Sequence, residues 1–465
     1  MRMFKRNRLR ALFAALLIAF PGYAFAHVKW FSDYSYAERP LSFDEIMTPL
    51  FGLLFAASVV SIAGIVVLDE RLTQTAWYRH LVERLRGYAS RSDLVLRVAV
   101  GGVLLLSWQS GAMLVPEIPS SHVLVDFVQL LLAILILSNR FTQVAGYGLI
   151  GLYILAYWKY GALHILDYIY LVGAAYYLIA SQSKQKKIRA SGLPVLYASV
   201  GFSLCWVALE KLVYPQWALS ILQDRPFLTM GFDPNFFLTS AAFVEFTLGF
   251  LLIVCLIQRP IAIAVTGLFM TTTMVFGKLE FVGHAIVHAA MIVFILQGRG
   301  ETFRTPITFF YHMWQRVAFS IVAFTAMYAL MLGSYDAIAT DVYLASKTMD
   351  HDMPMARAEW EGPDAPPALA VDVTRDAAGG WNVHLIADGF TFVPELAGQE
   401  PVQGEGHAHL YIDDRKIARM YSPWHYVAEL SPGTHTFMVT LNSNDHKLYA
   451  YQGHPIVARC TVVVE

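Results

Sequence analysis

The sequence predicts an all-α polytopic membrane bundle followed by an all-β sandwich domain. Of the 465 residues, 56% are hydrophobic and 15% are charged, a composition typical of integral membrane proteins. This apolar character ends near Tyr335, and short alternating runs separated by turn residues follow it. Such runs indicate strands of a sandwich. We therefore expect a transmembrane domain over 46–335 and a β-sandwich domain over 368–465.

Charge is divided unevenly between these parts. From Asp336 onward there are eight Lys and Arg against eighteen Asp and Glu, or about −10, so the rest is about +9 because the total is −1. A basic membrane body with an acidic outer domain gives no reason to expect a nucleic-acid partner. The lipid bilayer is the expected partner, and a periplasmic or membrane protein is a further candidate.

Residues 1–26 have the pattern of a signal peptide. Basic residues precede an apolar core over 11–20, and Ala24-Phe25-Ala26 fits a cleavage site. Cleavage would make His27 the first residue of an exported segment over 27–45; an uncleaved anchor is the alternative. An N-terminal His offers an amine and an imidazole to one metal ion, so His27 is a candidate metal ligand. The alternative is that cleavage merely exposes a histidine.

Apolar runs predict about ten transmembrane helices. The loops expected inside are richer in Lys and Arg than those outside, which places the N-terminus and the C-terminal domain in the periplasm of a bacterial inner-membrane protein. The expected spans are 46–68, 95–115, 122–138, 143–160, 162–180, 194–213, 236–257, 260–277, 281–297 and 315–334.

Two segments, about 95–180 and 194–298, repeat a carboxylate, an arginine and a histidine in order. Fourteen residues separate acid from arginine in both, and the histidine follows by 24 in one and 25 in the other. Both segments start on the inside, so we expect two parallel repeats. The matched residues are Asp126, Arg140 and His164 in the first and Glu245, Arg259 and His284 in the second.

Ionisable side chains inside hydrocarbon cost about 2.5–3.5 kcal/mol each on insertion scales, so they usually have a partner and a function. We expect an intramembrane binding site for a cofactor or ion near the outer face. The alternative is that each group snorkels or pairs within its own bundle. The candidates are Asp126, His164, Asp167, Glu210, Glu245, His284 and His288.

Residues 201–298 contain Ala208-Leu-Glu-Lys-Leu-Val-Tyr214, Phe243-Val-Glu-Phe-Thr-Leu-Gly249 and a final helix bearing His284 and His288. This stretch resembles the DoxX-like family of small four-helix membrane proteins. The resemblance implies thiosulfate:quinone oxidation or an accessory role, and therefore a quinone as an alternative cofactor.

A Met/His segment and a Pro-rich linker occupy 336–367. Met349, His351, Met353 and Met355 supply three thioethers and an imidazole within seven residues. Thioethers favour Cu(I), and imidazole binds either oxidation state of copper. The segment resembles the Met/His runs of periplasmic copper-handling proteins; the alternative is a flexible linker.

The β domain carries seven histidines. His407 and His409 share one strand face while Ala408, Leu410 and Ile412 take the core face, and such an i,i+2 pair can chelate one metal ion. Cys460 has no following His or Met, which argues against a blue-copper site. The domain resembles small CopC-like copper binders. Further ligands are expected from His435, His446 or His454.

The favoured hypothesis is an inner-membrane protein that captures copper outside and passes it to the intramembrane cluster. Two alternatives stay open: a DoxX-like, quinone-linked oxidoreductase subunit, and an assembly or scaffold factor with a partner-binding outer domain. No nucleophile elbow, phosphate loop, dinucleotide fingerprint or HExxH occurs in the sequence. Whether the protein is an enzyme stays open, with a non-enzyme favoured.

Overall fold

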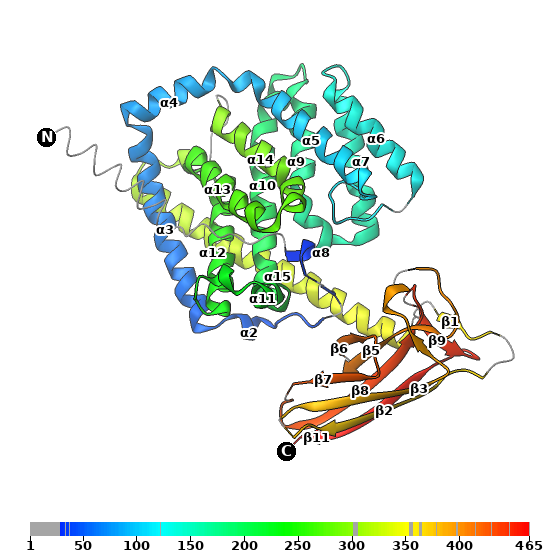
Figure 1. The fold of residues 1–465 in the computed structure, drawn as a ribbon. Helices are drawn as coiled ribbons and strands as arrows, with labels where there is room; N and C mark the ends of the chain where they lie inside the picture. The colour runs from blue at the N-terminus through cyan, green and yellow to red at the C-terminus, as the bar shows by residue number, and fades with distance from the viewer. Residues whose placement is uncertain are drawn as a thin grey trace. The chain divides into compact units, whose positions relative to one another are not determined.

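The chain forms two compact units, Met1–Tyr343 and Leu344–Glu465, in a computed structural model (Figure 1). The first is helical and the second is rich in β-strands, as expected from the sequence. The structure describes residues 28–464 except 33, 37, 121, 301–305, 353–356, 362–364, 378, 397–398, 414, 429 and 446. Residues 1–27, with the expected signal peptide and His27, lie outside the described part.

Helices follow one another with short connections in the first unit. The α-helices are α2 (Phe43–Ile46), α3 (Pro49–Thr73), α4 (Ala76–Arg86), α5 (Ser92–Gln109), α6 (Val123–Leu137), α7 (Thr142–Tyr160), α8 (Ala162–Ile165), α9 (Tyr170–Ser181), α10 (Lys186–Val213), α11 (Pro215–Asp224), α12 (Pro234–Ile253), α13 (Gln258–Phe276), α14 (Lys278–Gln297) and α15 (Met313–Asp352). Short 3-10 helices are η1 (Val28–Trp30), η2 (Ala89–Arg91), η3 (Leu166–Tyr168), η4 (Pro226–Thr229) and η5 (Pro306–Phe309).

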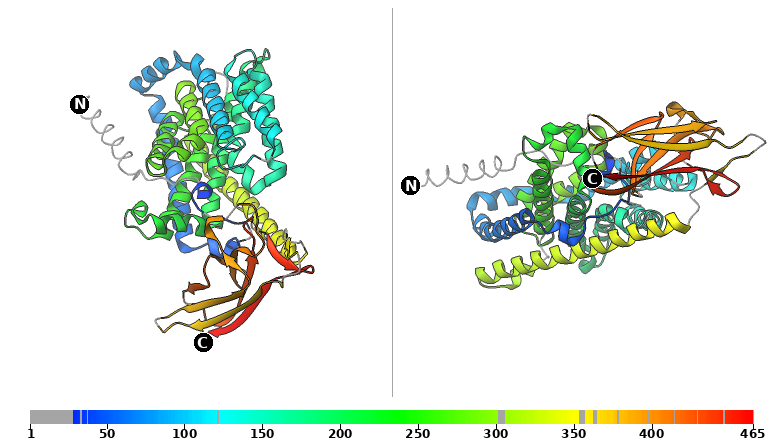
Figure 2. Two further views of the ribbon diagram at one scale, coloured as in Figure 1. Left: turned by 45° about the vertical axis from the view of Figure 1, so that its right-hand side comes forward. Right: turned by 90° about the horizontal axis from the view of Figure 1, so that it is seen from below.

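Six of the described helices are long and apolar enough to cross a membrane: α3, α10, α12, α13, α14 and α15. The α8–η3 segment and α9 would together make a seventh span, bent by 48°. Helices α5, α6 and α7 occupy the other expected spans, but they are not among these six. The chain therefore has the apolar helices of a membrane protein, and Figure 2 shows them from two further directions.

Helix starts follow local sequence signals. Thr48 precedes α3, and its hydroxyl accepts a hydrogen bond from the Phe51 amide at 3.2 Å. Asp233 does the same for Phe236 at the start of α12, at 2.9 Å. Proline occupies the first position of both helices, where its missing N–H costs nothing.

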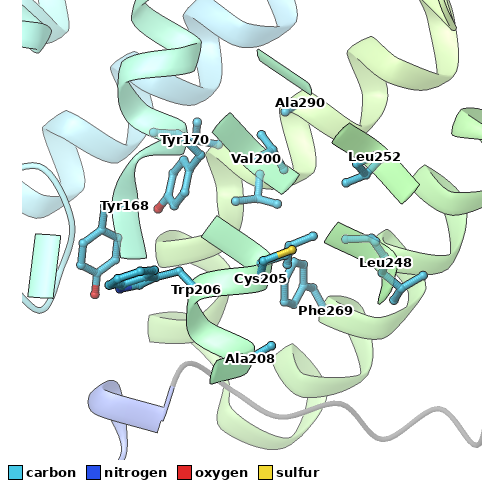
Figure 3. Close-up of a cluster of buried hydrophobic side chains, with 14 of the residues drawn as sticks. Tyr168, Tyr170, Val200, Cys205, Trp206, Ala208, Leu248, Leu252, Phe269 and Ala290 are labelled. Carbon is cyan, nitrogen blue, oxygen red and sulfur yellow. The ribbon is translucent and has the colours of Figure 1, made fainter. Parts of the chain in front are cut away.

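Helices α10 and α12 cross closely at the centre of the first unit. A Cβ added at Gly201 or Gly249 would lie 2.6 Å from the backbone carbonyl oxygen of the other glycine, so only glycine fits there. Cys205, Leu248 and Phe269 continue the apolar contact beside this crossing (Figure 3). The residues of the candidate site are positioned around α10.

The α15 helix is longer than the sequence suggested. The last span was expected to end at 334, but the helix continues to Asp352. No proline interrupts the chain before Pro354, so nothing in the sequence forces an earlier end. Met349 and His351 therefore belong to the end of a helix rather than to a linker, while Met353 and Met355 lie outside the described residues.

Two sheets form the second unit. The larger joins β1 (Arg357–Glu359), β4 (Thr391–Phe392), β5 (Glu405–Ile412), β6 (Arg415–Met420), β8 (Gly433–Asn442), β9 (Leu448–Tyr451), β10 (His454–Pro455) and β11 (Val457–Val464), and the smaller joins β2 (Ala368–Arg375), β3 (Trp381–Asp388) and β7 (Trp424–Val427). The short helix η6 (Pro394–Leu396) follows β4. The short alternating runs expected from the sequence fall on strands β2, β3, β5, β6, β7, β8 and β11.

The expected core face of the larger sheet is confirmed. Ala408, Leu410 and Ile412 are buried. Phe437, Val439 and Leu441 of β8 are buried with them in one apolar cluster. The pairing of β5 with β8 sets His407 opposite Asn442 and His409 opposite Thr440.

Candidate functional site

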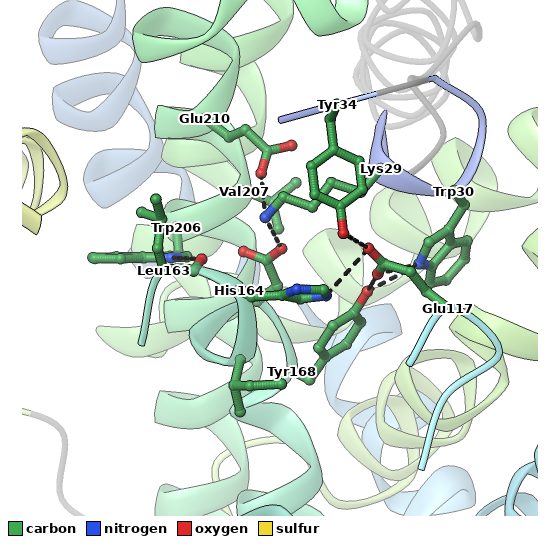
Figure 4. Close-up of polar contacts among 12 residues, drawn as sticks. Lys29, Trp30, Tyr34, Glu117, Leu163, His164, Tyr168, Trp206, Val207 and Glu210 are labelled. Atoms are coloured by element: carbon green, nitrogen blue, oxygen red, sulfur yellow. Dashed lines mark hydrogen bonds and ion pairs between the residues drawn. The ribbon is translucent and has the colours of Figure 1, made fainter. Parts of the chain in front are cut away.

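The ammonium group of Lys29 lies between two carboxylates in the interior of the helical unit. Its Nζ is 2.6 Å from Asp167 Oδ2 and 2.6 Å from Glu210 Oε2. Figure 4 shows Lys29 beside Glu210. The three side chains are 0%, 0% and 1% exposed. Burial alone would lower the pKa of Lys29, but the two carboxylates outweigh it and raise this pKa well above its usual value. Lys29 is therefore held as a cation.

Each member of this triad comes from a different part of the chain. Lys29 belongs to η1, Glu210 to the last turn of α10, and Asp167 to η3, just before the bend into α9. The bend is supported by Ser203, whose hydroxyl accepts a hydrogen bond from the Tyr170 amide at 3.2 Å. The N-terminal segment is thus joined to two membrane helices by buried charge.

A third carboxylate, Glu117, holds the same N-terminal segment. It accepts hydrogen bonds from Trp30 Nε1 at 3.1 Å, from the Tyr34 hydroxyl at 2.9 Å and from the Tyr168 hydroxyl. His164 Nε2 lies 3.2 Å from Glu117 Oε1. Burial and the Glu117 charge raise the pKa of Tyr34, so it stays a neutral donor. Glu117 thus gathers four side chains around one charge (Figure 4).

Buried Gln129 positions the loop that carries Glu117. Its Oε1 accepts from the Leu114 amide at 2.8 Å, and its Nε2 donates to the carbonyls of Leu104 and Ala112 at 3.0 and 2.9 Å. Leu114 adopts a positive φ of 68°. Such a conformation is unusual for a residue with a branched side chain and needs support from its surroundings. Gln129 provides that support.

Two further ion-pair positions lie on α10, α12 and α14. Lys211 Nζ is 2.8 Å from Glu245 Oε2, with both side chains buried. His284 Nδ1 is 3.2 Å from Glu280 Oε1. The His284 ring stacks on Phe269 at a centroid distance of 4.2 Å and lies 4.9 Å from the Trp30 ring.

A cavity lies beside the Lys211–Glu245 pair and His284. It has about 500 Å³ of empty space, part of it open to the outside, and it lies among α9, α10, α12, α13 and α14. Its polar lining comes from Asp167, Ser203, Lys211, Glu245 and His284. Trp30, Tyr170 and Phe269 add aromatic walls. The membrane unit therefore has an internal space bordered by acids, a lysine and a histidine.

The structure brings most of the expected intramembrane residues together. Asp167, Glu210, Glu245 and His284 surround Lys29 and the cavity, and His164 joins them through Glu117. His288 is buried near Phe269 and Phe281, and neither of its ring nitrogens has a hydrogen-bond partner in the described structure. Asp126 is partly exposed on α6 and does not line the cavity.

The site predicted from the sequence lacked Lys29, Trp30, Glu117, Gln129 and Lys211. Lys211 could have been found, because Glu210-Lys211 is an ionic pair of neighbours inside an apolar run. Nothing in the sequence indicates that the loop around Glu117 approaches the N-terminal segment.

In the β-rich unit, His407 and His409 are brought together. Their Nε2 atoms are 3.1 Å apart, and Lys416 Nζ lies 3.1 Å from His409 Nε2. The residues are 0% and 7% exposed, so this strand face is buried as well as the core face. Gly406 allows the close approach of β5 to β8 just before His407, because a Cβ there would collide with the Asn442 carbonyl.

The other expected ligands are placed differently. Both ring nitrogens of His435 are engaged, Nδ1 with Asp413 at 2.6 Å and Nε2 with the Ser431 carbonyl at 2.8 Å. His454 is exposed, and His446 lies outside the described residues. Within the described part of the chain, no three His, Cys, Asp or Glu side chains are arranged to hold one metal ion.

Comparison with known proteins found no matching family model, no matching curated protein and no matching solved structure.

Proposed function

We propose that this protein is a membrane-anchored copper-binding protein whose β-rich unit takes up the ion through His407 and His409. The observation that carries the proposal is the 3.1 Å separation of their Nε2 atoms on a buried face of β5. Two imidazole ligands at about 2.0–2.1 Å from one ion lie roughly 3 Å apart when the ligand–metal–ligand angle is near 100°. The pair is spaced for two adjacent ligands of one ion.

Copper is favoured over zinc for two reasons. For nitrogen ligands, copper(II) binds more tightly than the other divalent first-row metals. The chain also carries Met349, His351, Met353 and Met355 just before the β domain, and thioethers favour Cu(I). The acidic charge of about −10 from Asp336 onward would raise the local concentration of cations.

The proposed topology has about ten spans in a bacterial inner membrane, with two parallel repeats and with the N-terminus and the β domain in the periplasm. Its support is the inside excess of Lys and Arg in the sequence and a helix in each of the expected spans. A periplasmic β domain would meet copper before the membrane unit does.

Passage of copper to the intramembrane cluster is a further step of this proposal. The nearest oxygens of Asp167, Glu210 and Glu245 already contact Lys29 or Lys211. An incoming copper ion would have to displace these ammonium groups. We therefore place the primary copper site in the β-rich unit.

Metal analysis of the purified full-length protein tests the proposal. Exchange of both His407 and His409 for Ala should remove one equivalent of bound copper, whereas His454→Ala, which changes an exposed imidazole, should not. Lys416→Met should raise copper affinity, because it removes the cation beside His409 Nε2. Unchanged copper content in the double variant would refute the proposal.

A second candidate function is that of a quinone-linked membrane protein, and the cavity in the helical unit favours it. The 500 Å³ of empty space includes open solvent, and only about 40 Å³ of it admits the centre of a water-sized molecule, so a quinone ring would enter from the open side and displace lining side chains. Lys211 and His284 could donate hydrogen bonds to quinone carbonyls, while Trp30 and Phe269 provide flat apolar walls. Acids beside the cavity could exchange protons with the ring.

Solvent extraction of the purified protein, followed by quantification of quinone, tests this candidate. His284→Phe keeps the ring bulk but removes the donor, so it should lower the quinone content. Lys278→Gln changes an exposed lysine outside the cavity lining and should leave it unchanged. Absence of quinone from the wild-type protein in a quinone-containing membrane would rule this function out.

A further inference from the structure

Helix α4 begins where several of the membrane-crossing helices end. Asp69, near the end of α3, forms an ion pair with Arg299, just beyond α14. Glu70 Oε2 is 3.2 Å from Arg316 Nη1, near the start of α15. These contacts bring the ends of three long apolar helices to one level. Helix α4 starts shortly after α3 and turns away from it there (Figure 1), so it lies where the headgroups of a bilayer would surround the protein.

One side of α4 is apolar, and the chain covers only part of it. Helix α4 packs against α14, and Tyr78 and Val82 are buried and half-buried in the apolar core of the first unit. Trp77 and Leu81 lie beside them on the helix, one turn apart, but they are 46% and 41% exposed. Tryptophan is enriched at the boundary between lipid and water. The uncovered apolar part of α4 therefore suits a membrane surface.

Arginines occupy the remaining surface of α4 and continue beyond both of its ends. Residues 71–91 contain five arginines and one acidic residue, Glu83, so their net charge is about +4 with His80 neutral. The five are exposed: Arg71, Arg79, Arg84, Arg86 and Arg91. Glu83 lies 3.5 Å from His80, and the first four of these arginines have no ion pair with any described residue. The positive charge of this surface is thus left for a partner outside the chain.

We propose that residues 71–91 bind the headgroups of anionic phospholipids, with Trp77 and Leu81 in the lipid and the arginines on the phosphates. Guanidinium groups bind phosphate oxygens through charge-assisted, often bidentate hydrogen bonds. Basic amphipathic helices with Trp and Leu on the apolar side lie in the plane of a membrane surface. A soluble polyanion would match the arginines but not the apolar residues between them. Lipid binding of this kind is independent of copper or quinone binding elsewhere in the chain.

Lipid binding to the purified full-length protein in detergent tests this surface. The probes are fluorescent phosphatidylglycerol and, as the uncharged reference, fluorescent phosphatidylcholine. Each basic residue near an anionic surface raises affinity several-fold, so exchange of Arg79, Arg84 and Arg86 for Gln should weaken phosphatidylglycerol binding by about tenfold or more. Phosphatidylcholine binding should stay unchanged. Equal affinity of the wild type for the two lipids would overturn the proposal.

The matched control removes the same charge elsewhere. Lys184, Lys186 and Lys187 are exposed, and the described residues around them, 182–193, include no exposed large apolar side chain. Exchange of these three lysines for Gln should keep the preference for phosphatidylglycerol. An equal loss in both triple variants would attribute the preference to total charge and overturn the assignment to α4.

Tryptophan fluorescence in lipid vesicles tests whether the apolar side of α4 enters the bilayer. The emission of Trp77 is the difference between the wild type and Trp77→Phe. Phospholipids with brominated acyl chains should quench this emission in vesicles that contain phosphatidylglycerol. Absence of quenching would leave Trp77 in water and overturn the proposal.

Hydrogen exchange over residues 76–86 distinguishes lipid from a soluble polyanion. Exchange should be slower in bilayers that contain phosphatidylglycerol than in pure phosphatidylcholine. The difference should shrink between about 0.1 M and about 1 M salt, because the screening length falls from about 10 Å to about 3 Å. Slower exchange on addition of heparin, without any effect of phosphatidylglycerol, would assign the arginines to a soluble polyanion and overturn lipid binding.

Discussion

The indole ring of Trp30 lies over Gly283 of α14, in the space that a Cβ at this position would occupy. The same backbone position is fixed by Tyr170, whose hydroxyl donates to the Gly283 carbonyl at 3.2 Å. Trp30 also donates to the Tyr168 hydroxyl at 2.9 Å. The N-terminal segment is therefore a packed part of the membrane unit, and glycine at 283 is what allows its approach.

Gly283→Ala should displace Trp30 and loosen the N-terminal segment. Overpacking of a tight interior costs about 1–3 kcal/mol, so the melting temperature should fall and protease should reach this segment sooner. Gly267→Ala on α13 is the matched control, because a Cβ there meets nothing within 4 Å. Equal protease sensitivity of the two variants would mean that the Trp30 contact does not hold the segment.

Lys211→Met should destabilise the membrane unit strongly. The change leaves the Glu245 carboxylate buried without its ion-pair partner, and breaking a buried pair from one side costs about 3–5 kcal/mol. Removal of both charges in Lys211→Met/Glu245→Leu should restore much of the loss. The melting temperatures of the two variants in one detergent give the comparison, and a double variant as unstable as the single one would contradict the ion-pair explanation.

The broad division of the chain was predictable because it depends on composition. Long apolar runs predict helices, and alternation predicts strands, from neighbouring residues alone. Ala408, Leu410 and Ile412 were placed correctly on the core face for this reason. The end of α15 was missed because composition becomes polar before the helix stops.

The site was only partly predictable, because its partners are distant in sequence. Charged residues inside apolar runs pointed to Asp167, Glu210 and Glu245, since such groups need partners. Lys29, the partner of Asp167 and Glu210, is 138 residues from Asp167, and no local pattern connects the two. His409 is the reverse case. The alternation of side chains along a strand predicted that His409 lies beside His407, but it could not predict that Lys416 contacts His409.

Gln129→Leu should disturb the loop that carries Glu117 more than the similar volumes of the two side chains suggest. The change leaves the buried Leu114 amide and two carbonyls without their hydrogen-bond partner. Each unsatisfied buried group costs about 1–3 kcal/mol. We expect lower thermal stability and faster hydrogen exchange over residues 110–120. Exchange over α15 serves as an internal reference, and unchanged exchange in the loop would show that Gln129 does not position it.

The ion pair of His435 and Asp413 should make the stability of the β-rich unit depend on pH. Hydrogen bonds from the imidazole to the Ser431 carbonyl and the Asp413 carboxylate raise the pKa of His435. Because the folded state holds this proton more tightly, the contribution is complete below about pH 6.5, the ordinary histidine value, and is lost as the pH rises through the raised folded-state value.

Asp413 shifts in the opposite direction and limits the effect on the acid side. Hydrogen bonds from the Thr436 amide and from His435 lower the pKa of Asp413 despite partial desolvation, so its contribution is complete above about pH 4 and is lost below it. The pair therefore stabilises most between these limits. In unfolding of the full-length protein, His435→Gln should lower the melting temperature at pH 5.5 more than at pH 8.5. His454→Gln, an exposed histidine, should show no such difference, and an equal loss for His435→Gln at both pH values would contradict the ion pair.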